Sequence, residues 1–450
     1  MHNQDTIAAI ATPCGSGGVA VIRISGNKAK DIASRFSGLQ TFTPRYCYFA
    51  NFRDENAEII DQGLLIYFAA PNSFTGEDTV ELQGHGGRGV AQLLLRQCFI
   101  YGARAAEGGE FSKRAFLNGK IDLAQAEAIA DLINAETAAA VRAANRSLQG
   151  EFSVKIEQIA AEIKAIRVFI EAVLDFPDEE IGYLEEGKIA RRIFDLSAAI
   201  TDIISNARQG KLLNDGIKIA LIGKPNVGKS SLLNALSGDD LAIVSAKAGT
   251  TRDIVRSKIV LAGMLVEILD TAGMRADTRD EIEMEGIKRS QKAANDADLL
   301  LVVLDATASP KEEEEFLSEM VEIIQDKKDK TIFIYNKQDL LTDVNTVENK
   351  DKLFISAKTG FGLKELENKV AELVGKQDEE AVFISRERHI SALQKTLSEV
   401  KNAACNLENN QLEFTASDLY QAQNFLAEIT GKVSTDELLD EIFSGFCIGK

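Results

Sequence analysis

One stretch decides the fold of the middle of this 450-residue chain: Ile219-Ala220-Leu221-Ile222-Gly223-Lys224-Pro225-Asn226-Val227-Gly228-Lys229-Ser230. Four apolar residues run into a Gly-x-x-x-x-Gly-Lys-Ser loop, and residues 231–236 continue with the apolar spacing of a helix. In a strand, loop and helix of this kind, backbone N–H groups and the positive end of the helix surround phosphate oxygens. We expect Lys229 to reach the β- and γ-phosphates of a nucleotide and the Ser230 hydroxyl to hold Mg²⁺.

The composition limits the kind of protein that this chain can be. Its length suggests about three domains, and its net charge of −18 argues against a surface that binds nucleic acid through bulk electrostatics. A local patch or a partner could still hold an RNA. The longest apolar run, Leu299 to Leu304, is too short to span a membrane, so no membrane is expected.

The cysteines and the first residues indicate the compartment. The five cysteines are scattered and have no metal-ligand spacing, and no basic segment followed by an apolar stretch begins the chain. A reducing cytoplasmic location is therefore expected. The cysteines are Cys14, Cys47, Cys98, Cys405 and Cys447.

Residues 1–118 are expected to form an α+β domain. The pattern predicts helices at Lys28–Phe36 and Val90–Tyr101. Strands are predicted at Thr6–Ala11, Gly18–Ile24, Arg45–Phe52, Gly63–Ala69 and Thr79–Gln83.

One segment of this domain matches the sequence motif of a dinucleotide-binding site. Gly84-His85-Gly86-Gly87-Arg88-Gly89 matches Gly-x-Gly-x-x-Gly between a predicted strand and a predicted helix. The segment after the helix, residues 103–109, does not read as a second strand, so the βαβ unit is incomplete. We therefore reject an oxidoreductase.

Residues 119–215 and 377–450 are helical and are expected to form one discontinuous domain. A helix with apolar residues at three- and four-residue steps begins near Phe152 and stops at Asp175-Phe176-Pro177. The inserted segment 216–376 alternates strands with helices, as a doubly wound sheet requires. Its strands are predicted at Ile217–Ile222, Ser257–Val260, Leu265–Asp270, Leu299–Asp305, Thr331–Asn336 and Leu353–Ser356. The expected fold is therefore multidomain α/β.

Two further motifs in the inserted domain select GTP. Asp270-Thr271-Ala272-Gly273 follows a strand, where Asp270 can orient Mg²⁺ and the Gly273 N–H can meet the γ-phosphate. Asn336-Lys337-Gln338-Asp339 also follows a strand, and its carboxylate can accept hydrogen bonds from N1–H and N2 of guanine. Adenine has neither donor, so it would be rejected. Ser356-Ala357-Lys358 would contact the edge of the base. The domain is thus expected to be a Ras-like P-loop GTPase.

The segment Ser245–Asp253 is the expected first switch, with Thr251 as the second hydroxyl on Mg²⁺. Position 274, where Ras-related GTPases carry a water-positioning Gln, holds Met274, so hydrolysis is slow or a polar group comes from elsewhere. The residues expected to contact GTP are Asn226, Val227, Gly228, Lys229, Ser230, Ser231, Ser245, Ala246, Lys247, Ala248, Gly249, Thr250, Thr251, Asp270, Thr271, Ala272, Gly273, Asn336, Lys337, Asp339, Ser356, Ala357 and Lys358.

Three features resemble the TrmE-Era-type GTPases, which lack that Gln: Gly223–Ser230, Gly249-Thr250-Thr251-Arg252-Asp253 and the apolar Met274. The flanking sequence narrows the resemblance to the MnmE (TrmE) family of tRNA modification GTPases, and it runs the full length of the chain. It rests on Phe116–Glu127, on Glu81–Gly87 and on the terminal Phe446-Cys447-Ile448-Gly449-Lys450.

The resemblance implies how GTP would be hydrolysed. In this family the GTPase domains of a homodimer meet on GTP binding, and K⁺ lies beside the phosphates, where it neutralises charge as an arginine finger would. Asn226 matches the side-chain ligand of K⁺, and Ser245, Lys247 and Thr250 match the others. Glu283 matches the glutamate that orients water. The neighbouring Glu281 and Glu285 leave open that all three belong to a solvated acidic face.

The resemblance also implies a folate site in the N-terminal domain, which dimerises in this family. Arg23, Glu81, Lys120 and Lys450 match the contacts to 5-formyltetrahydrofolate, a one-carbon cofactor. Cys447 matches a cysteine that acts in the modification reaction; the alternative is a small side chain buried in the core.

The implied activity is addition of an aminomethyl or carboxymethylaminomethyl group to carbon 5 of the wobble uridine of certain tRNAs. It is shared with the partner MnmG (GidA) in a heterotetramer, and GTP hydrolysis drives a conformational change. The alternative is an Era-like GTPase that assists ribosome assembly and has no modification chemistry.

Overall fold

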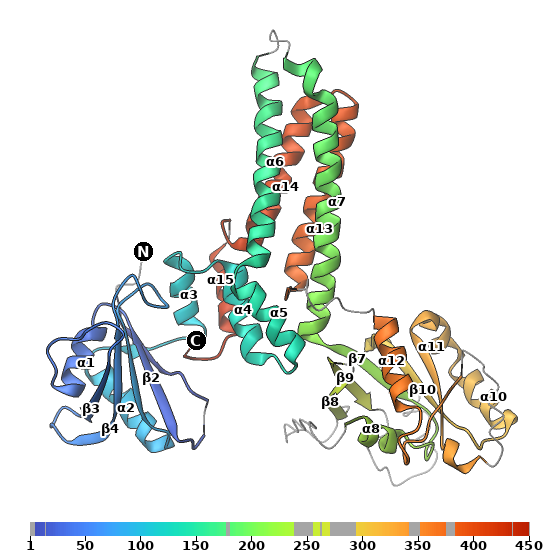
Figure 1. Ribbon diagram of the computed structural model, residues 1–450, viewed down its shortest axis with the longest axis horizontal. Helices are drawn as coiled ribbons and strands as arrows, with labels where there is room; N and C mark the ends of the chain where they lie inside the picture. Colours follow the sequence, from blue (N-terminus) through green and yellow to red (C-terminus); the bar gives the residue numbers. More distant parts are fainter. Residues whose placement is uncertain are drawn as a thin grey trace. The chain divides into compact units, whose positions relative to one another are not determined.

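The computed structural model describes two compact units (Figure 1). Unit 1 comprises Met1–Asn134, Asn145–Asp202 and Ser391–Lys450, and unit 2 comprises Ala135–Ala144 and Ile203–Ile390. The described residues are 5–13, 15–176, 181–237, 255–261, 263–270, 294–341, 352–374, 383–433 and 435–449, with backbone alone at 181–187, 255–257, 270 and 322–323.

The N-terminal part of unit 1 is a six-stranded sheet with helices on one face. The strand order is β3-β4-β5-β2-β1-β6, and every pairing is antiparallel except that of β1 with β6. Helices α1 and α2 contribute Ile32, Phe36 and Leu94 to the core between helices and sheet. The elements are β1 (Ile7–Ile10), β2 (Val19–Ser25), α1 (Ala29–Ser37), β3 (Cys47–Arg53), β4 (Ile59–Phe68), β5 (Thr79–His85), α2 (Arg88–Ile100) and β6 (Arg104–Ala105).

The opposite face of this sheet is open along β3, β4 and β5, whereas Phe111 of the following helix, α3 (Glu110–Leu117), packs on Ile7 and Ala9 of β1. Side chains alternate between the two faces along a strand, so Ala20, Ile22 and Ile24 of β2 are buried while Val19 and Arg23 are not. Large apolar side chains are exposed on this face, among them Val19, Phe49 and Leu64. An antiparallel sheet can carry such a half-covered arrangement, whereas a parallel sheet rarely does.

The helical part of unit 1 brings together segments far apart in the sequence. Leu123 and Ala126 of α4 pack with Leu439, Phe443 and Phe446 near the C-terminus. Helices α6 and α14 run side by side (Figure 1). The helices are α3 (Glu110–Leu117), α4 (Leu123–Asn134), α5 (Ala138–Leu148), α6 (Glu151–Asp175), α7 (Ile181–Asp215), α13 (Glu387–Glu408), α14 (Leu412–Thr430) and α15 (Asp436–Ser444), of which α5, α7 and α13 cross the limits between units.

Unit 2 contains a second six-stranded sheet, in the order β12-β11-β10-β7-β9-β8. All pairings are parallel except that of β8 with β9. Separate apolar cores cover its two faces, which confirms the doubly wound sheet. Its elements are β7 (Ile217–Ile222), α8 (Lys229–Ser237), β8 (Val255–Leu261), β9 (Met264–Asp270), β10 (Leu299–Asp305), α10 (Pro310–Glu319), α11 (Val321–Asp326), η1 (Lys328–Lys330), β11 (Thr331–Asn336), η2 (Gln338–Leu340), β12 (Leu353–Phe354) and α12 (Leu363–Val374).

The expected fold class is confirmed, with corrections in detail. Residues 103–109 do contain a strand: Arg104–Ala105 pairs in parallel with β1. Two residues are too few to show the alternation by which strands are recognised in a sequence. Helix α3 was not predicted, and the last strand of the inserted domain ends at Phe354 rather than at Ser356. None of the described helices has the length and apolar character needed to cross a membrane.

Candidate functional site

The phosphate-binding loop connects β7 to α8. Asn226 and Gly228 adopt left-handed backbone conformations, with φ of 64° and 97°, which Asn and Gly tolerate best. The Lys229 side chain is buried, and its ammonium group donates to the carbonyl oxygens of Gly223 (2.5 Å) and Lys224 (2.9 Å). The loop is therefore closed around its own lysine, with Ser230 and Ser231 exposed at the start of α8.

Asn336 joins the three loops expected to hold the nucleotide. Its buried side chain donates to the Val227 carbonyl (2.9 Å) and accepts from the Ala357 N–H (3.0 Å). A Cβ on Gly228 would lie 2.2 Å from the Asn336 amide nitrogen. Glycine is thus required at position 228 both for its backbone conformation and for this contact.

The Asp339 carboxylate, which is predicted to read guanine, is held by a neighbouring hydroxyl group. The Ser356 hydroxyl donates to one Asp339 oxygen at 2.6 Å. Lys337 also has a left-handed backbone (φ 70°), and its ammonium group pairs with Asp305 at 2.6 Å. Partial burial raises the pKa of Asp305, but the hydrogen bonds from Lys337 and Thr307 outweigh it and hold the pKa below the ordinary value.

The sequence prediction missed Asp305. Only its position in the sequence could have indicated it. Asp305 is the last residue of strand β10, and Asn336 is the last residue of the neighbouring strand β11. The carboxyl ends of neighbouring parallel strands meet at one edge of the sheet, where α/β proteins bind ligands.

Part of the predicted nucleotide site lies outside the described residues. This holds for Ser245, Ala246, Lys247, Ala248, Gly249, Thr250, Thr251, Thr271, Ala272, Gly273 and Glu283, and for the side chain of Asp270. Among the described side chains no group of three His, Cys, Asp or Glu could hold a metal. The exposed Ser230 hydroxyl fits Mg²⁺, which takes few protein ligands and completes its shell with phosphate oxygens and water.

Two predicted folate contacts, Arg23 and Glu81, lie together on the open face of the N-terminal sheet. They are partners in the β2–β5 register, and the guanidinium group pairs with the carboxylate at 3.0 Å. The Arg23 guanidinium carbon also lies 6.0 Å from the Phe74 ring centre and 5.8 Å from that of Phe111. A cation, a carboxylate and two aromatic rings suit a ligand with a flat ring and carboxylates.

The third predicted folate contact, Lys120, donates to the Pro71 carbonyl oxygen at 3.0 Å. It is exposed and lies along the segment that follows β4, since a Cβ on Gly76 would contact its side-chain carbons. The fourth contact, Lys450, lies outside the described residues.

The C-terminal tail, residues 446–449, contacts the N-terminal sheet beside Arg23. Ile448 forms a β-bridge with Gly108, and the Gly109 N–H donates to the Cys447 carbonyl (3.4 Å). Arg23 donates to the Gly449 carbonyl at 3.3 Å. The Cys447 side chain is exposed, so its interpretation as a buried core residue is wrong.

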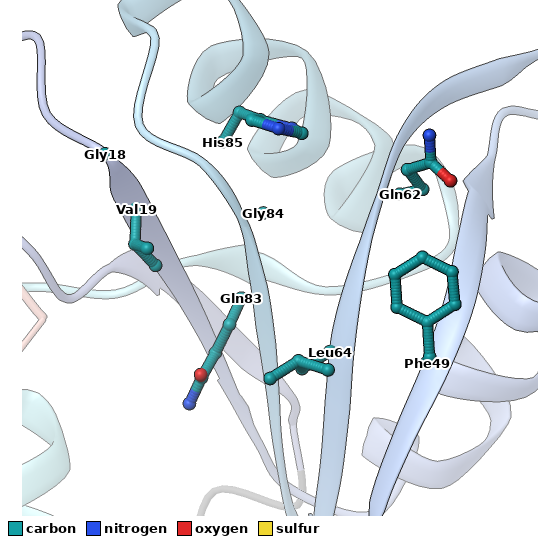
Figure 2. Close-up of a pocket in the computed structure, with 8 residues that line it drawn as sticks. All are labelled: Gly18, Val19, Phe49, Gln62, Leu64, Gln83, Gly84 and His85. Carbon is teal, nitrogen blue, oxygen red and sulfur yellow. The ribbon is translucent and has the colours of Figure 1, made fainter.

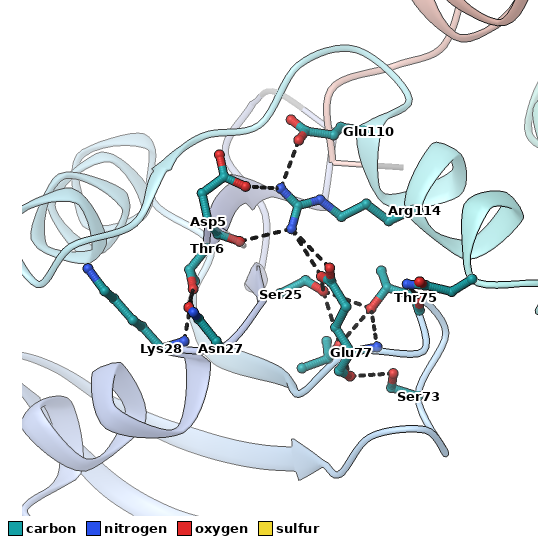
Figure 3. Close-up of polar contacts among 12 residues, drawn as sticks. Asp5, Thr6, Ser25, Asn27, Lys28, Ser73, Thr75, Glu77, Glu110 and Arg114 are labelled. Carbon is teal, nitrogen blue, oxygen red and sulfur yellow. Dashed lines mark hydrogen bonds and ion pairs between the residues drawn. The ribbon is translucent and has the colours of Figure 1, made fainter. Parts of the chain in front are cut away.

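A buried ion network supports the edge of the N-terminal sheet (Figure 3). Arg114 of α3 has only 7% of its side chain exposed and pairs with Asp5, Glu77 and Glu110 at 2.7, 3.1 and 2.9 Å. The Ser25 hydroxyl extends the network by donating to Glu77 at 2.8 Å. The network anchors α3, whose Phe111 lies beside Arg23. No sequence motif predicts this network.

Known proteins match the whole chain. The family model described as the MnmE helical domain matches residues 123–447, and the model described as the GTP-binding protein TrmE N-terminus matches residues 6–120. A tRNA modification GTPase MnmE from Dichelobacter nodosus is 50% identical over 100% of both chains. One from Coxiella burnetii is 47% identical over 99% of both.

Among solved structures, the chain is similar to the G domain of the T. maritima FeoB iron transporter. That likeness has 29% sequence identity, covers 35% of this chain and 99% of the other, and has a TM-score of 0.27.

A full-length match at half identity, with both family models in their expected places, leaves one assignment: the chain belongs to the MnmE family of tRNA modification GTPases.

Proposed function

We propose that this chain hydrolyses GTP and, together with MnmG (GidA), adds a carboxymethylaminomethyl or aminomethyl group to carbon 5 of the wobble uridine of certain tRNAs. The observation that carries the GTPase part is the arrangement around Asn336, which ties the phosphate-binding loop to the loop that carries Asp339. Membership of the family supports the tRNA part.

We further propose that hydrolysis depends on a homodimer of GTPase domains and on K⁺. Asn226 is exposed in the loop, so its side-chain oxygen is free to ligate a cation beside the phosphates. Ser245, Lys247 and Thr250 would supply the remaining oxygens, Thr251 would join Ser230 on Mg²⁺, and Glu283 would orient the attacking water. K⁺ would neutralise the charge that develops on the phosphates.

We propose that the modification chemistry lies in the N-terminal domain. Arg23, Glu81, Lys120 and Lys450 would hold 5-formyltetrahydrofolate, and the tail contacts of Arg23 and Gly109 support a role for Cys447 near that cofactor. GTP hydrolysis would then drive a conformational change rather than the modification itself. The proposed location is the cytoplasm.

The first experiment measures GTP hydrolysis in K⁺ and in Na⁺, with and without MnmG. Because the cation would replace an arginine finger, K⁺ should accelerate hydrolysis by more than about tenfold. Asn226→Ala should retain GTP binding and lose the K⁺ stimulation, whereas Asn226→Asp, which keeps an oxygen ligand, should retain part of it. Equal rates in both cations would refute the K⁺ proposal.

A second experiment separates this function from the Era-like alternative. Cys447→Ser should abolish wobble-uridine modification in cells while GTP hydrolysis stays intact. Normal modification would remove Cys447 from the chemistry. No detectable binding of 5-formyltetrahydrofolate by the isolated protein would favour the assembly GTPase.

A further inference from the structure

Asp61 and Asp305 each hold a neighbouring side chain in a fixed position, and neither belongs to the predicted contacts. Asp61 pairs with Nδ1 of His85 at 2.7 Å in the N-terminal domain. Asp305 pairs with the ammonium group of Lys337 at 2.6 Å in the nucleotide domain. Lys337 is a predicted GTP contact and His85 is not, so the two held side chains differ in what they can serve.

His85 lies at a cavity of about 440 Å³ on the N-terminal sheet (Figure 2). Phe49 and Leu64 form part of its lining, together with Gln62 and Gln83. The two amide side chains lie on opposite sides of Leu64 (Figure 2), so they do not converge on one ligand. The side chain that Asp305 holds, by contrast, lies where a ligand is expected.

The Asp305 carboxylate is held in one orientation by Thr307 and Lys337. Its Oδ1 accepts from the Thr307 N–H at 3.0 Å and from the Thr307 hydroxyl at 2.7 Å. Its Oδ2 accepts from the Lys337 ammonium group at 2.6 Å. Because Thr307 fixes one oxygen, the other faces Lys337.

Lys337 is held at both of its ends. Its backbone has the left-handed conformation (φ 70°), which a lysine rarely adopts. The Leu340 N–H donates to the Lys337 carbonyl at 3.0 Å and closes the turn. Since Asp305 fixes the ammonium group, the methylene chain crosses from the end of β11 to the end of β10. A lysine side chain without such a partner would sample many rotamers.

Support of the two strands does not explain this ion pair. Strands β10 and β11 are already paired through to Asp305 and Asn336, and the Ala306 N–H continues the ladder to the Asn336 carbonyl at 2.8 Å. The Lys337 and Asp305 side chains are 32% and 21% exposed, and ion pairs open to solvent add little to stability. The strand ends are therefore secured without it.

The strand order places the pair beneath the expected nucleotide. Strands β11, β10 and β7 are neighbours in the sheet. The phosphate-binding loop follows β7, Asp339 follows β11, and Asp305 ends β10 between them. A nucleotide with its phosphates in the loop and its base at Asp339 therefore crosses the end of β10, where the Lys337 chain lies.

We propose that Asp305 positions Lys337 so that the lysine's methylene chain supports the base and sugar of a guanine nucleotide. A lysine chain can cover a flat, apolar surface while its charged end lies elsewhere. Because protein groups alone order this chain, the nucleotide binds without the entropy cost of immobilising it. The inference rests on the proposed GTP function and adds a positioning residue to it.

Release of N-methylanthraniloyl-GDP from the full-length protein, followed by stopped-flow fluorescence, tests this role. Asp305→Ala should release the nucleotide about three- to tenfold faster, as expected when one long side chain is no longer ordered in advance. In GTP hydrolysis the change should appear in KM more than in kcat. Asp305→Asn keeps the shape of the side chain without its charge and should release at an intermediate rate. It carries the test if Asp305→Ala does not fold.

Asp298 offers a matched control at the other end of β10. Its carboxylate accepts from the Lys218 N–H at 2.9 Å, and it is exposed at the amino end of the strand. Asp298→Ala should leave the release of the fluorescent GDP unchanged. Equal acceleration by Asp298→Ala and Asp305→Ala would show a general loosening of the domain and would overturn the proposal.

A double-mutant cycle shows whether Asp305 acts through Lys337. Lys337→Met keeps an apolar chain of similar length but leaves no cation for Asp305 to hold. In that background Asp305→Ala should add no further acceleration. A full additional effect would show that Asp305 acts independently of Lys337, and the positioning role would be wrong.

The same measurement separates this inference from the proposed function. If the wild-type protein binds the fluorescent GDP and Asp305→Ala releases it at the wild-type rate, only the role of Asp305 is refuted. If the wild-type protein binds no guanine nucleotide, the proposed GTPase function is refuted with it.

Discussion

The two sheets of this protein carry their candidate sites in different places. In the nucleotide domain, Lys229, Asn336 and Asp305 lie in or beside loops at the carboxyl ends of parallel strands. In the N-terminal domain, Arg23 and Glu81 lie inside strands, on the face opposite α1 and α2, where Phe111 of α3 lies beside Arg23. Helices cover both faces of the nucleotide-domain sheet, so only its edge is free. The N-terminal sheet leaves most of one face free.

This difference determines what a sequence reveals. Edge sites consist of short contiguous loops, so their residues appear as motifs. A face site takes alternate residues from several strands, and its members are related by register rather than by sequence.

The edge site should depend on single side chains. Asp339→Asn should weaken GTP binding about a hundredfold or more and improve binding of xanthosine triphosphate, because the carboxylate held by Ser356 is the group that we propose to read guanine. Fluorescent-nucleotide titrations measure both affinities. Asp329→Asn, at an exposed position, is the control, and an unchanged preference for GTP would contradict the assignment of Asp339.

The face site should depend on the support behind it. Arg114→Met should cost about 1.5–3 kcal/mol of unfolding free energy, because it removes the buried cation that Glu77 and Glu110 share, although Glu110 keeps its pairing with Arg104 at 2.6 Å. Urea unfolding followed in the N-terminal domain measures the loss. Arg96→Met, at an exposed position of α2, should change stability by less than about 0.5 kcal/mol. Equal effects of the two changes would mean that the network is not a support.

The same network should make this domain sensitive to acid. Burial raises the pKa of Asp5 and of Glu110, but the hydrogen bonds from Arg104 and Arg114 outweigh it and hold both pKa values below the ordinary range. Their stabilisation is present above the unfolded-state pKa of about 4 and is lost as the pH falls through the folded-state pKa. The stability difference between wild type and Arg114→Met should therefore shrink as the pH falls below about 5. A constant difference would contradict this origin.

The smallest effect is expected at the tail. A Cβ on Gly109, where φ is 65°, would lie 2.6 Å from the Phe443 carbonyl oxygen, so Gly109→Ala should loosen the tail at a cost of about 1–2 kcal/mol. Amide hydrogen exchange should quicken in residues 446–449. Gly89→Ala, which would add a Cβ in open space, should leave exchange there unchanged. Equal exchange in both variants would show that Gly109 does not hold the tail.

The elements of the nucleotide domain follow from local patterns in the sequence. Strand, loop and helix around Gly228 and Lys229 are neighbours in the chain, and the Asn336–Asp339 loop follows a strand whose apolar run is unmistakable. Local hydrogen bonding and hydrophobic period decide such elements, so the prediction needed no knowledge of distant contacts. The apolar spacing likewise predicted the long helix α6 (Glu151–Asp175).

The arrangement of side chains on the N-terminal sheet depends on contacts between distant segments of the chain. Asp61 and His85 are 24 residues apart, and Arg114 gathers partners from as far as Asp5. A carboxylate or an arginine in these positions reads from sequence as a solvated surface charge, because burial and pairing arise only when strands align and α3 packs on their edge. The cavity beside Phe49 has the same origin, since pairing of β3, β4 and β5 creates its floor.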